Sequence, residues 1–414
     1  MDEYRYAESF LGEYLEDVWR CIRCGFCNSV CPTSNSSFSY MSSKTSRGRI
    51  VLLQAYFSGL LKKPLKDSYL QELLDYCFGC RRCLDICPPG VRIPYILWRV
   101  KYLGRKSKLS DKLFYGNYGW FEKLCSLSPR ISNKILRSKI GKLALELIIG
   151  FDRRIDFPRF NDFSLESWIR KNKESNHSRK KLAYFIDIFT NYHEVDLGIE
   201  VVRLFRKLGY SVDAPPQREA GTLYLEAGQI DKAIKIARVN VESLYRSIMN
   251  GATVITSSPA AYLALKKDYP EILGDSKSKM VSDSTIDVTE LILEEYENGR
   301  IRFNKPDDEI KIVYHHSCFT KASGLTKTIK RLLNIAGYKL VEVDDCCGIG
   351  GIWGMYRKHY DESIDVGRSL FDKLMNLKLP VASQSETCRI QLRNHALVEA
   401  DHPFSYISRV ARID

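Results

Sequence analysis

Eight of the 13 cysteines lie in two clusters near the N-terminus, and both clusters have the same spacing. Each cluster fits C-x₂-C-x₂-C-x₃-C followed by proline, without a gap. Three thiolates separated by two residues can bind three corners of one iron–sulfur cubane, while the fourth cysteine, next to the proline, ligates the other cubane. The spacing therefore predicts two [4Fe–4S] clusters, one bound by Cys21, Cys24, Cys27 and Cys87 and the other by Cys77, Cys80, Cys83 and Cys31.

Zinc is the alternative, because paired C-x-x-C motifs also bind it. Zinc sites do not need a third and a fourth cysteine at these offsets, twice over, so the pattern favours iron–sulfur clusters. The N-terminus is acidic and polar and does not read as a signal peptide. Tightly clustered cysteines in such a chain indicate metal or cluster binding in a reducing cytosol and argue against disulfides.

A second group of cysteines lies in the last quarter of the chain. Cys318, Cys346, Cys347 and Cys388 each stand at or next to a predicted strand end or turn. Side chains at the carboxyl ends of strands in an α/β unit converge on one crevice. We therefore expect a metal or cluster site, the alternative being four small buried hydrophobic residues. The glycines after Cys347 do not form a dinucleotide-binding fingerprint, because Trp353 stands at the third glycine position.

Four blocks position these cysteines. We predict a helical two-cluster ferredoxin-like module at residues 1–98, a basic helical connector at 99–181, and two α/β repeats at 182–300 and 301–414. Each repeat opens with a short apolar strand, followed by an amphipathic helix that ends at glycine and then by a second strand. This alternation predicts an α/β fold with mainly parallel sheets.

The charge is concentrated in the connector. The 414-residue chain has a net charge of +13, and residues 99–181 alone carry 21 Lys and Arg against 8 Asp and Glu. A basic amphipathic stretch can lie on an anionic membrane surface or bind an acidic partner; the alternative is a solvated connector packed on its own domains. No nucleic-acid-binding motif accompanies the charge, and no apolar run reaches the roughly 18 residues that a membrane span needs.

Taken together, these motifs resemble a known family. Two C-x₂-C-x₂-C-x₃-C-P motifs followed by a duplicated cysteine-rich CCG domain are similar to the iron–sulfur C subunit of anaerobic glycerol-3-phosphate dehydrogenase. They are also similar to the D subunit of heterodisulfide reductase and to the iron–sulfur subunits of glycolate and lactate oxidases. The resemblance covers nearly the whole chain. It implies an electron-transfer subunit that works with an FAD-containing dehydrogenase subunit, in the cytoplasm, peripherally on the inner face of the cell membrane.

The resemblance also implies ligands for the C-terminal site. The family pattern matches Cys318, Cys346, Cys347 and Cys388, but Ser385 replaces one further cysteine. With four thiols, the site could hold a noncubane or cubane iron–sulfur cluster or a zinc ion. The first repeat has no thiol at the equivalent positions, which are occupied by Ile188, Glu219, Ala220, Ser258 and Ala261. We expect that repeat to complete the core and to form a wall of the second repeat's site.

The resulting hypothesis is an electron relay. A flavin subunit oxidises a small hydroxy-substrate such as glycerol 3-phosphate, lactate or glycolate, and electrons pass through two cubanes and the CCG site to a quinone or another carrier. The alternative is a thiol–disulfide reductase of the heterodisulfide type, in which the CCG site itself cleaves a disulfide. The absence of these thiols from the first repeat argues against a disulfide reductase, because enzymes of the heterodisulfide type use both CCG sites.

Overall fold

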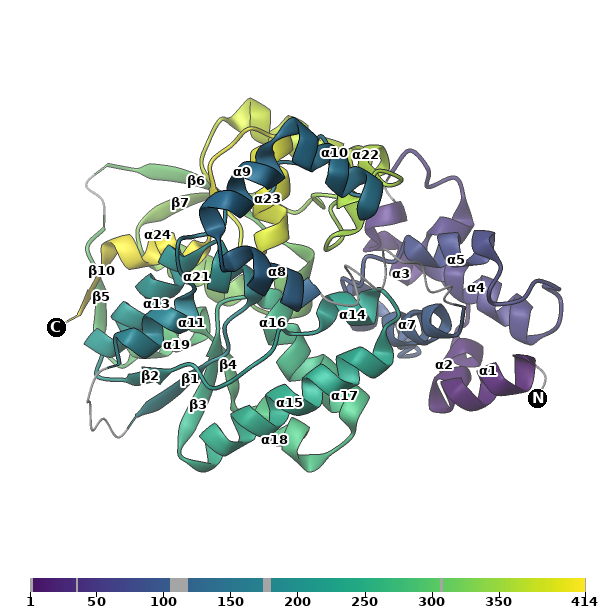
Figure 1. The fold of residues 1–414 in the computed structure, drawn as a ribbon, viewed down its shortest axis with the longest axis horizontal. Coiled ribbons are helices and arrows are strands. Elements are labelled where there is room, and N and C mark those ends of the chain that lie inside the picture. Colours follow the sequence, from purple (N-terminus) through teal and green to yellow (C-terminus); the bar gives the residue numbers. More distant parts are fainter. Residues whose placement is uncertain (1–2, 35, 105–117, 174–179, 306–307, 414) are drawn as a thin grey trace.

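The computed structural model describes residues 3–34, 36–104, 118–173, 180–305 and 308–413 (Figure 1). Two parts of the predicted connector, residues 105–117 and 174–179, lie outside the described residues. In Figure 1 a helical region that contains the N-terminus lies on the right, and an α/β region that contains the C-terminus extends to the left.

The N-terminal region is helical, as predicted. Its elements are α1 Glu3–Leu11, α2 Glu13–Arg20, α3 Phe26–Ser29, the short 3₁₀ turns η1 Pro32–Ser34 and η2 Ser42–Lys44, α4 Ser46–Phe57, α5 Ser68–Asp75, α6 Arg82–Ile86 and α7 Ile93–Gly104. Thr45 begins α4 because its side chain accepts a hydrogen bond from the Gly48 N–H. Helix α7 is buried along most of its length, and Trp98 is completely enclosed.

The described part of the connector contains four helices. They are α8 Tyr118–Ser126, α9 Pro129–Arg137, α10 Lys139–Ile148 and α11 Leu165–Lys171. Pro129 begins α9, and the Ser138 side chain caps α10 by accepting from the Gly141 N–H. Figure 1 shows α8–α10 in dark blue, overlapping in this view with α23 Glu386–His395 of the α/β region. Within the described residues, no helix has the length and hydropathy required to cross a membrane.

Two four-stranded parallel sheets confirm the α/β prediction. The first contains β1 Lys181–Tyr184, β2 Ser211–Asp213, β3 Ala252–Thr256 and β4 Thr285–Asp287, in the order β2-β1-β3-β4. The second contains β6 Ile310–His315, β7 Tyr338–Val343, β8 Val381–Ala382 and β9 Ala400–Asp401, in the order β7-β6-β8-β9. Every pairing within them is parallel. The shared order shows that the two repeats have the same topology.

Helices connect these strands. Those of the first repeat are α12 Ile188–Tyr192, α13 Val195–Lys207, α14 Thr222–Glu226, α15 Ile230–Met249, α16 Pro259–Leu263, the π-helical turn η4 Ala264–Asp268, α17 Tyr269–Leu273, α18 Ser276–Ser284 and α19 Val288–Glu297. Those of the second are α20 Cys318–Ala322, α21 Thr326–Ile335, the 3₁₀ turn η5 Trp353–Met355, α22 Tyr360–Leu377, α23 and α24 Pro403–Val410. Gly209 and Gly337 follow α13 and α21 with positive φ, as predicted.

One apolar core runs across the regions. Val18 of the N-terminal region, Phe151 of the connector and Leu392 of the second repeat belong to the same buried cluster. A second cluster joins β1 of the first repeat to β6 of the second. A short antiparallel pair, β5 Ile301–Phe303 with β10 Ala411–Ile413, which the sequence did not predict, links the beginning of the second repeat to its end. The regions are therefore packed together through shared hydrophobic surface.

Candidate iron–sulfur and thiol sites

The two N-terminal motifs fold into the same backbone shape. In the first motif Arg23 and Gly25 flank Cys24 and have φ of 59° and 85°, and in the second Gly79 and Arg81 flank Cys80 with 61° and 60°. Arginine is rarely left-handed, because its Cβ then crowds the following carbonyl at a cost of roughly 1–2 kcal/mol. The same unusual conformation at matching positions curls each loop around its cysteines.

The thiols of the first N-terminal motif lie close to those of the second. Cys27 is within electrostatic range of Cys31, Cys21 and Cys87, and Cys83 is within range of Cys77, Cys31 and Cys27. The fourth cysteine of each motif therefore approaches the thiols of the other motif. Helices α3 and α6, which carry Cys27 and Cys83, pack against each other.

The surroundings of these thiols fit a group that binds thiolates. Burial raises the pKa of Cys27 and raises that of Cys83 well above its ordinary value, so a bound metal cluster has to displace their protons. Ser46 hydrogen-bonds both thiols. The Val91 N–H donates to Cys87 Sγ at 3.3 Å. Buried thiols with hydrogen-bond donors aimed at sulfur are a donor set suited to soft iron–sulfur clusters.

A buried ion pair fixes the second motif to the first repeat. The Arg81 guanidinium donates from Nε to Asp268 Oδ1 at 3.0 Å and also pairs with Oδ2, and both side chains are fully buried. Arg81 Nη1 donates to the Gly79 carbonyl at 2.6 Å, and the Tyr95 hydroxyl donates to Asp268 Oδ1 at 2.9 Å. The loop around Cys80 is thus held from both sides.

The four C-terminal cysteines converge, as the sequence predicts. Cys318 begins α20 directly after β6, and its Sγ lies 3.9 Å from Cys346 Sγ. Cys347 Sγ lies 3.1 Å from Cys388 Sγ, which comes from α23, and Cys346 also hydrogen-bonds Cys347. The Gly348 N–H donates to Cys346 Sγ at 3.4 Å. These thiols line a cavity of about 380 Å³, called here the thiol cavity.

The thiol cavity also contains a cysteine of the second N-terminal motif. Cys80 lines it, and its thiol is in hydrogen-bonding contact with that of Cys318. The five thiols are therefore neighbours in one series, in the order Cys80, Cys318, Cys346, Cys347 and Cys388. Among the described residues, no three His, Cys, Asp or Glu side chains group in the arrangement of a single metal ion. No local pattern in the sequence signals this contact, because the two cysteines are far apart in the chain.

The glycines after Cys347 allow close packing around the thiol cavity. A Cβ added at Gly350 would lie 2.8 Å from the Phe78 ring, and one added at Gly348 would lie 2.0 Å from the Ser363 carbonyl oxygen. Both glycines have positive φ. Since Phe78 follows Cys77, these glycines bring the C-terminal thiols against the second N-terminal motif.

The first repeat has a matching site without thiols. Asp187 caps α12 where Ser317 caps α20, so Ile188 stands at the position of Cys318. Gly221 follows Glu219 and Ala220 and has the same φ, 80°, as Gly348. These residues line a separate cavity of about 590 Å³, called here the acid-lined cavity because its wall contains Asp187, Glu219, Glu226 and Glu386.

The acid-lined cavity touches the thiol cavity. Both are lined by Phe319, Gly351, Ser385 and Thr387. Burial raises the pKa of Asp187 to about 6, of Glu226 to about 7 and of Glu386 to about 8. Sequence reasoning missed these acids, because a lone carboxyl beside a strand end reads as a helix cap or a surface charge.

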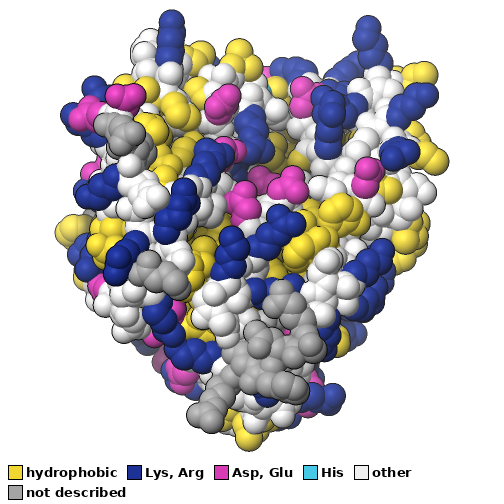
Figure 2. All heavy atoms as spheres, turned by 90° about the vertical axis from the view of Figure 1, so that its left-hand side faces the viewer, with side chains coloured by type: hydrophobic (Ala, Val, Ile, Leu, Met, Phe, Trp, Pro, Cys, Tyr) yellow, Lys and Arg dark blue, Asp and Glu magenta, His cyan; other side chains and the backbone are white. Residues whose placement is uncertain are grey.

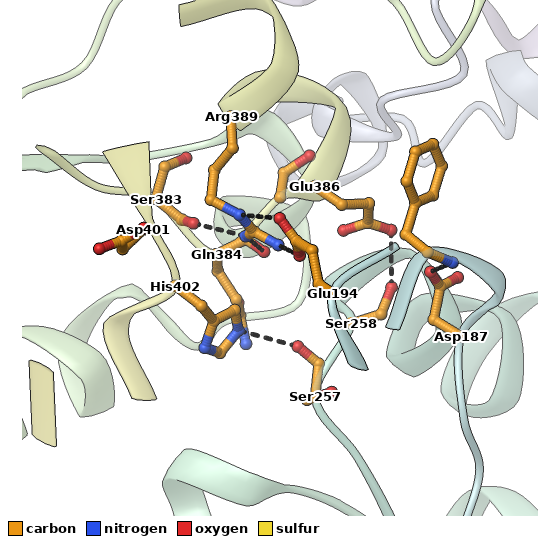
Figure 3. A network of polar contacts seen from close by, with 12 residues as sticks. Asp187, Glu194, Ser257, Ser258, Ser383, Gln384, Glu386, Arg389, Asp401 and His402 are labelled. Carbon is orange, nitrogen blue, oxygen red and sulfur yellow. Dashed lines mark hydrogen bonds and ion pairs between the residues drawn. The ribbon is translucent and has the colours of Figure 1, made fainter. Parts of the chain in front are cut away.

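Figure 3 shows the polar network beside these acids. Arg389 of α23 points at Glu194 and donates to it, and it also donates to the Ser383 and Gln384 carbonyls at 2.7 and 2.6 Å. The Ser258 hydroxyl donates to Glu386 Oε1 at 2.9 Å. The network bridges the two repeats and fixes the backbone on which Ser385 and Glu386 stand.

Comparison with known proteins agrees with this geometry. A 4Fe-4S dicluster domain matches residues 17–91, and a cysteine-rich domain of the CCG type matches residues 312–393. The chain is 28% identical to the C subunit of anaerobic glycerol-3-phosphate dehydrogenase of Escherichia coli (strain K12), over 94% of this chain and 97% of that protein.

Two further similar proteins are also subunits of oxidoreductases. The glycolate oxidase iron–sulfur subunit of the same organism is 26% identical, over 86% of this chain and 84% of that protein. The D subunit of the dihydromethanophenazine:CoB–CoM heterodisulfide reductase of Methanosarcina barkeri is 24% identical, over 81% and 79%. With a 4Fe-4S dicluster domain at one end and a cysteine-rich domain at the other, the chain is similar over most of its length to these oxidoreductase subunits.

Proposed function

We propose that this chain is the electron-transferring iron–sulfur subunit of a flavin-dependent dehydrogenase. A separate FAD-containing subunit oxidises a small hydroxy-substrate of the glycerol 3-phosphate, lactate or glycolate type, and this chain delivers the electrons to a quinone or another carrier. The names of the relatives support the substrate class. The predicted division at residues 98, 181 and 300 remains part of this proposal.

The N-terminal thiols are the proposed ligands of two [4Fe–4S] clusters. One cluster takes Cys21, Cys24, Cys27 and Cys87, and the other takes Cys77, Cys80, Cys83 and Cys31. The exchange of fourth ligands is supported by the position of Cys87 beside Cys27 and of Cys31 beside Cys83. When bound, each cluster supplies one-electron redox chemistry at a potential set by its surroundings.

The C-terminal thiols are the proposed ligands of a further group, either a third iron–sulfur cluster of cubane or noncubane type or a zinc ion. Cys318, Cys346, Cys347 and Cys388 would hold it. Their convergence and the Gly348 N–H directed at Cys346 Sγ support a thiolate site. Ser385 lines the same cavity and is buried, at the position where the family pattern has a further cysteine.

The contact between Cys80 and Cys318 carries the proposed order of the relay. One thiol belongs to the second N-terminal motif and the other to the C-terminal site, and they are in hydrogen-bonding contact inside one cavity. Electrons entering the N-terminal module therefore have a direct route to the C-terminal site through adjoining ligands.

The alternative is a thiol–disulfide reductase, which the relationship to the D subunit of heterodisulfide reductase favours. The first repeat has Ile188, Glu219 and Ala220 where a second thiol site would need cysteines. A two-site disulfide cleavage therefore lacks half of its ligands, and we prefer the relay.

We also propose that α8–α10 bind an anionic membrane surface from the cytoplasmic side. Exposed apolar side chains lie on these helices and in the turn between α8 and α9: Ile140 is 82% exposed, Leu147 is 75% exposed and Leu127, in the turn, is 73% exposed. Lysines and arginines accompany them: Lys123, Arg130, Lys134, Arg137, Lys139 and Lys142. Figure 2 shows that Lys and Arg also spread over the end of the α/β region that faces the viewer, with hydrophobic patches between them. Apolar insertion plus attraction to anionic lipid is the pattern of a peripheral helix.

The experiment is anaerobic reconstitution of the full chain, followed by iron and sulfide analysis and electron paramagnetic resonance during a reductive titration. We expect about eight iron atoms per chain from the two cubanes, and more if the C-terminal site holds iron. Cys318→Ser should change the signal of the second-motif cubane through the shared contact and leave that of the first unchanged. Stoichiometric zinc without iron in the N-terminal module would overturn the relay.

A further inference from the structure

Three cavities follow one another from the connector helices to the thiols. The first, called here the outer cavity, has a volume of about 520 Å³ and adjoins the acid-lined cavity through Tyr118, Phe189 and Ile352, which line both. The acid-lined cavity in turn shares Phe319 and Ser385 with the thiol cavity. A molecule in the middle cavity would therefore lie between the connector and the thiol site.

The outer cavity is apolar and is formed by the proposed membrane-binding helices. Its walls contain Phe121 of α8, Leu136 of α9 and Leu145 of α10. Helix α10 also carries the exposed Ile140 and Leu147. The helices thus present apolar surface both outward and toward the cavity, an arrangement suited to the passage of a lipid-soluble molecule.

The acid-lined cavity combines apolar walls with buried carboxyl groups. Phe189, Ile188 and Phe319 supply flat apolar surface. Glu226 Oε1 is buried and has no hydrogen-bond partner among the described residues. A Cβ added at Gly351 would lie 2.8 Å from Glu226 Oε2, which places this carboxyl beside the glycines that follow Cys347. A buried polar atom without a partner costs about 1–3 kcal/mol. When protonated, the Glu226 carboxyl can donate its O–H to a carbonyl oxygen of a ligand in this cavity.

We propose that the acid-lined cavity binds the ring of a lipid-soluble quinone, which enters from the membrane through the outer cavity and is reduced there. This inference rests on the proposed electron relay and assigns its final acceptor a class and a place. A quinone matches the observations because its ring and tail are apolar, whereas its two oxygens each take up a proton on reduction.

The reaction balances with groups that the chain and the relay supply. The quinone takes two electrons and two protons to become the quinol. The electrons come ultimately from the reduced flavin of the partner subunit. An iron–sulfur cluster held by the C-terminal thiols would pass them on one at a time, whereas a zinc ion there would pass none. The protons come from the carboxyl O–H groups of Glu226 and Asp187, which then regain protons from solvent.

The surroundings allow these carboxyls to hold a proton near neutral pH. Burial raises the pKa of Glu226 to about 7, although the cations Arg81 and Lys101 oppose the shift and Asp268 adds to it. Burial likewise raises the pKa of Asp187 to about 6, although the Phe189 and Ile188 N–H groups that donate to its carboxylate oppose the shift. Both carboxyls therefore keep their protons to a higher pH than ordinary carboxyls do.

The test uses the reconstituted full chain and heptyl-hydroxyquinoline N-oxide, a fluorescent quinone analogue whose emission falls on binding. Ala260 lines the acid-lined cavity, and Ala260→Trp fills it. We expect saturable quenching with the wild type and at least about tenfold weaker binding with Ala260→Trp, equal to a loss of about 1.4 kcal/mol. Ser276→Trp, an exposed substitution on α18, is the matched control and should bind normally.

The isosteric variants Glu226→Gln and Asp187→Asn address the protons and guard against misfolding. Both should bind the analogue within about threefold of wild type but form quinol at least about tenfold more slowly. Reduction of their clusters by the flavin partner should not change. Loss of quinol formation together with unchanged binding supports the proposal.

Several results would overturn it. Absence of saturable binding to the wild type, or equal binding by Ala260→Trp, places the quinone elsewhere. Full quinol formation by Glu226→Gln and Asp187→Asn together removes their role as proton donors. If a low-molecular-weight disulfide competes with the analogue and is reduced, the cavity belongs to the disulfide reductase alternative. Failure of the partner to reduce the clusters contradicts the relay itself, and analogue binding is measured independently of that failure.

Discussion

Replacing Asp268 with alanine should strongly destabilise the junction between the second N-terminal motif and the first repeat. The Arg81 and Asp268 side chains are both fully buried, and Tyr95 donates to the same carboxylate. After the substitution, the buried Arg81 guanidinium keeps the Gly79 carbonyl as a hydrogen-bond acceptor but loses both oxygens of Asp268. Breaking a buried pair in this way costs about 3–5 kcal/mol. Since Arg81 adjoins Cys80, the second cubane should become more labile.

The assay is iron release to a chelator under anaerobic conditions, combined with denaturant unfolding of the reconstituted chain. A loss of about 3–5 kcal/mol corresponds to an opening equilibrium increased by roughly two to four orders of magnitude. Asp283→Ala is the control, because its partner Lys279 and Asp283 itself are 68% and 61% exposed, so the change should cost under about 1 kcal/mol. The reasoning is refuted if Asp268→Ala costs no more than this control.

Three further predictions concern the clusters, the membrane and pH. Cys31→Ser should weaken the paramagnetic signal of the second-motif cubane; loss of the first-motif signal instead would show that the fourth ligands are not exchanged. The chain should bind anionic vesicles at low salt and leave them at high salt, and Ile140→Glu should reduce binding severalfold; salt-independent behaviour would contradict the proposal. Burial lowers the pKa of His193, but the Glu122 carboxylate more than offsets this, so the net shift is upward. The contact between α8 and α12 should therefore be most stable below the unfolded pKa of about 6.5 and lose stability as pH rises through the higher folded pKa. Thermal unfolding at a series of pH values measures this dependence, and His193→Gln should flatten it. If the pH dependence of stability is the same in the variant, the pair of His193 and Glu122 is not its cause.

The local parts of this structure could be predicted from the sequence. The cysteine spacing in the two N-terminal motifs is set within a few residues, and strands such as β1 and β6 are apolar runs with clear turn signals. Helix ends at Gly209 and Gly337 follow from the ease with which glycine adopts positive φ. The short pair of β5 and β10 could not be predicted, because strands of three residues far apart in the chain carry little periodic signal.

The site itself was only partly predictable. Convergence of the C-terminal cysteines follows from their place after parallel strands. The contact between Cys80 and Cys318 depends on how two regions pack, and no local pattern encodes it. Likewise, Asp187 reads as a helix cap, a role it does have, and only the packing of the second repeat encloses it. From the sequence, the apolar residues of α10 could either bind a membrane or partner surface or pack against the protein's own domains. In the structure, Ile140 is exposed.

The most direct test of the relay is Cys347→Ser in the complete complex with its flavin partner. Cys347 is buried against Cys388 and lies outside the N-terminal motifs. Substrate-driven bleaching of the flavin and of the two cubanes is followed separately from turnover of the final acceptor. The relay predicts that bleaching survives while acceptor turnover collapses. Full turnover in the variant would contradict it and reduce the C-terminal cysteines to a structural role.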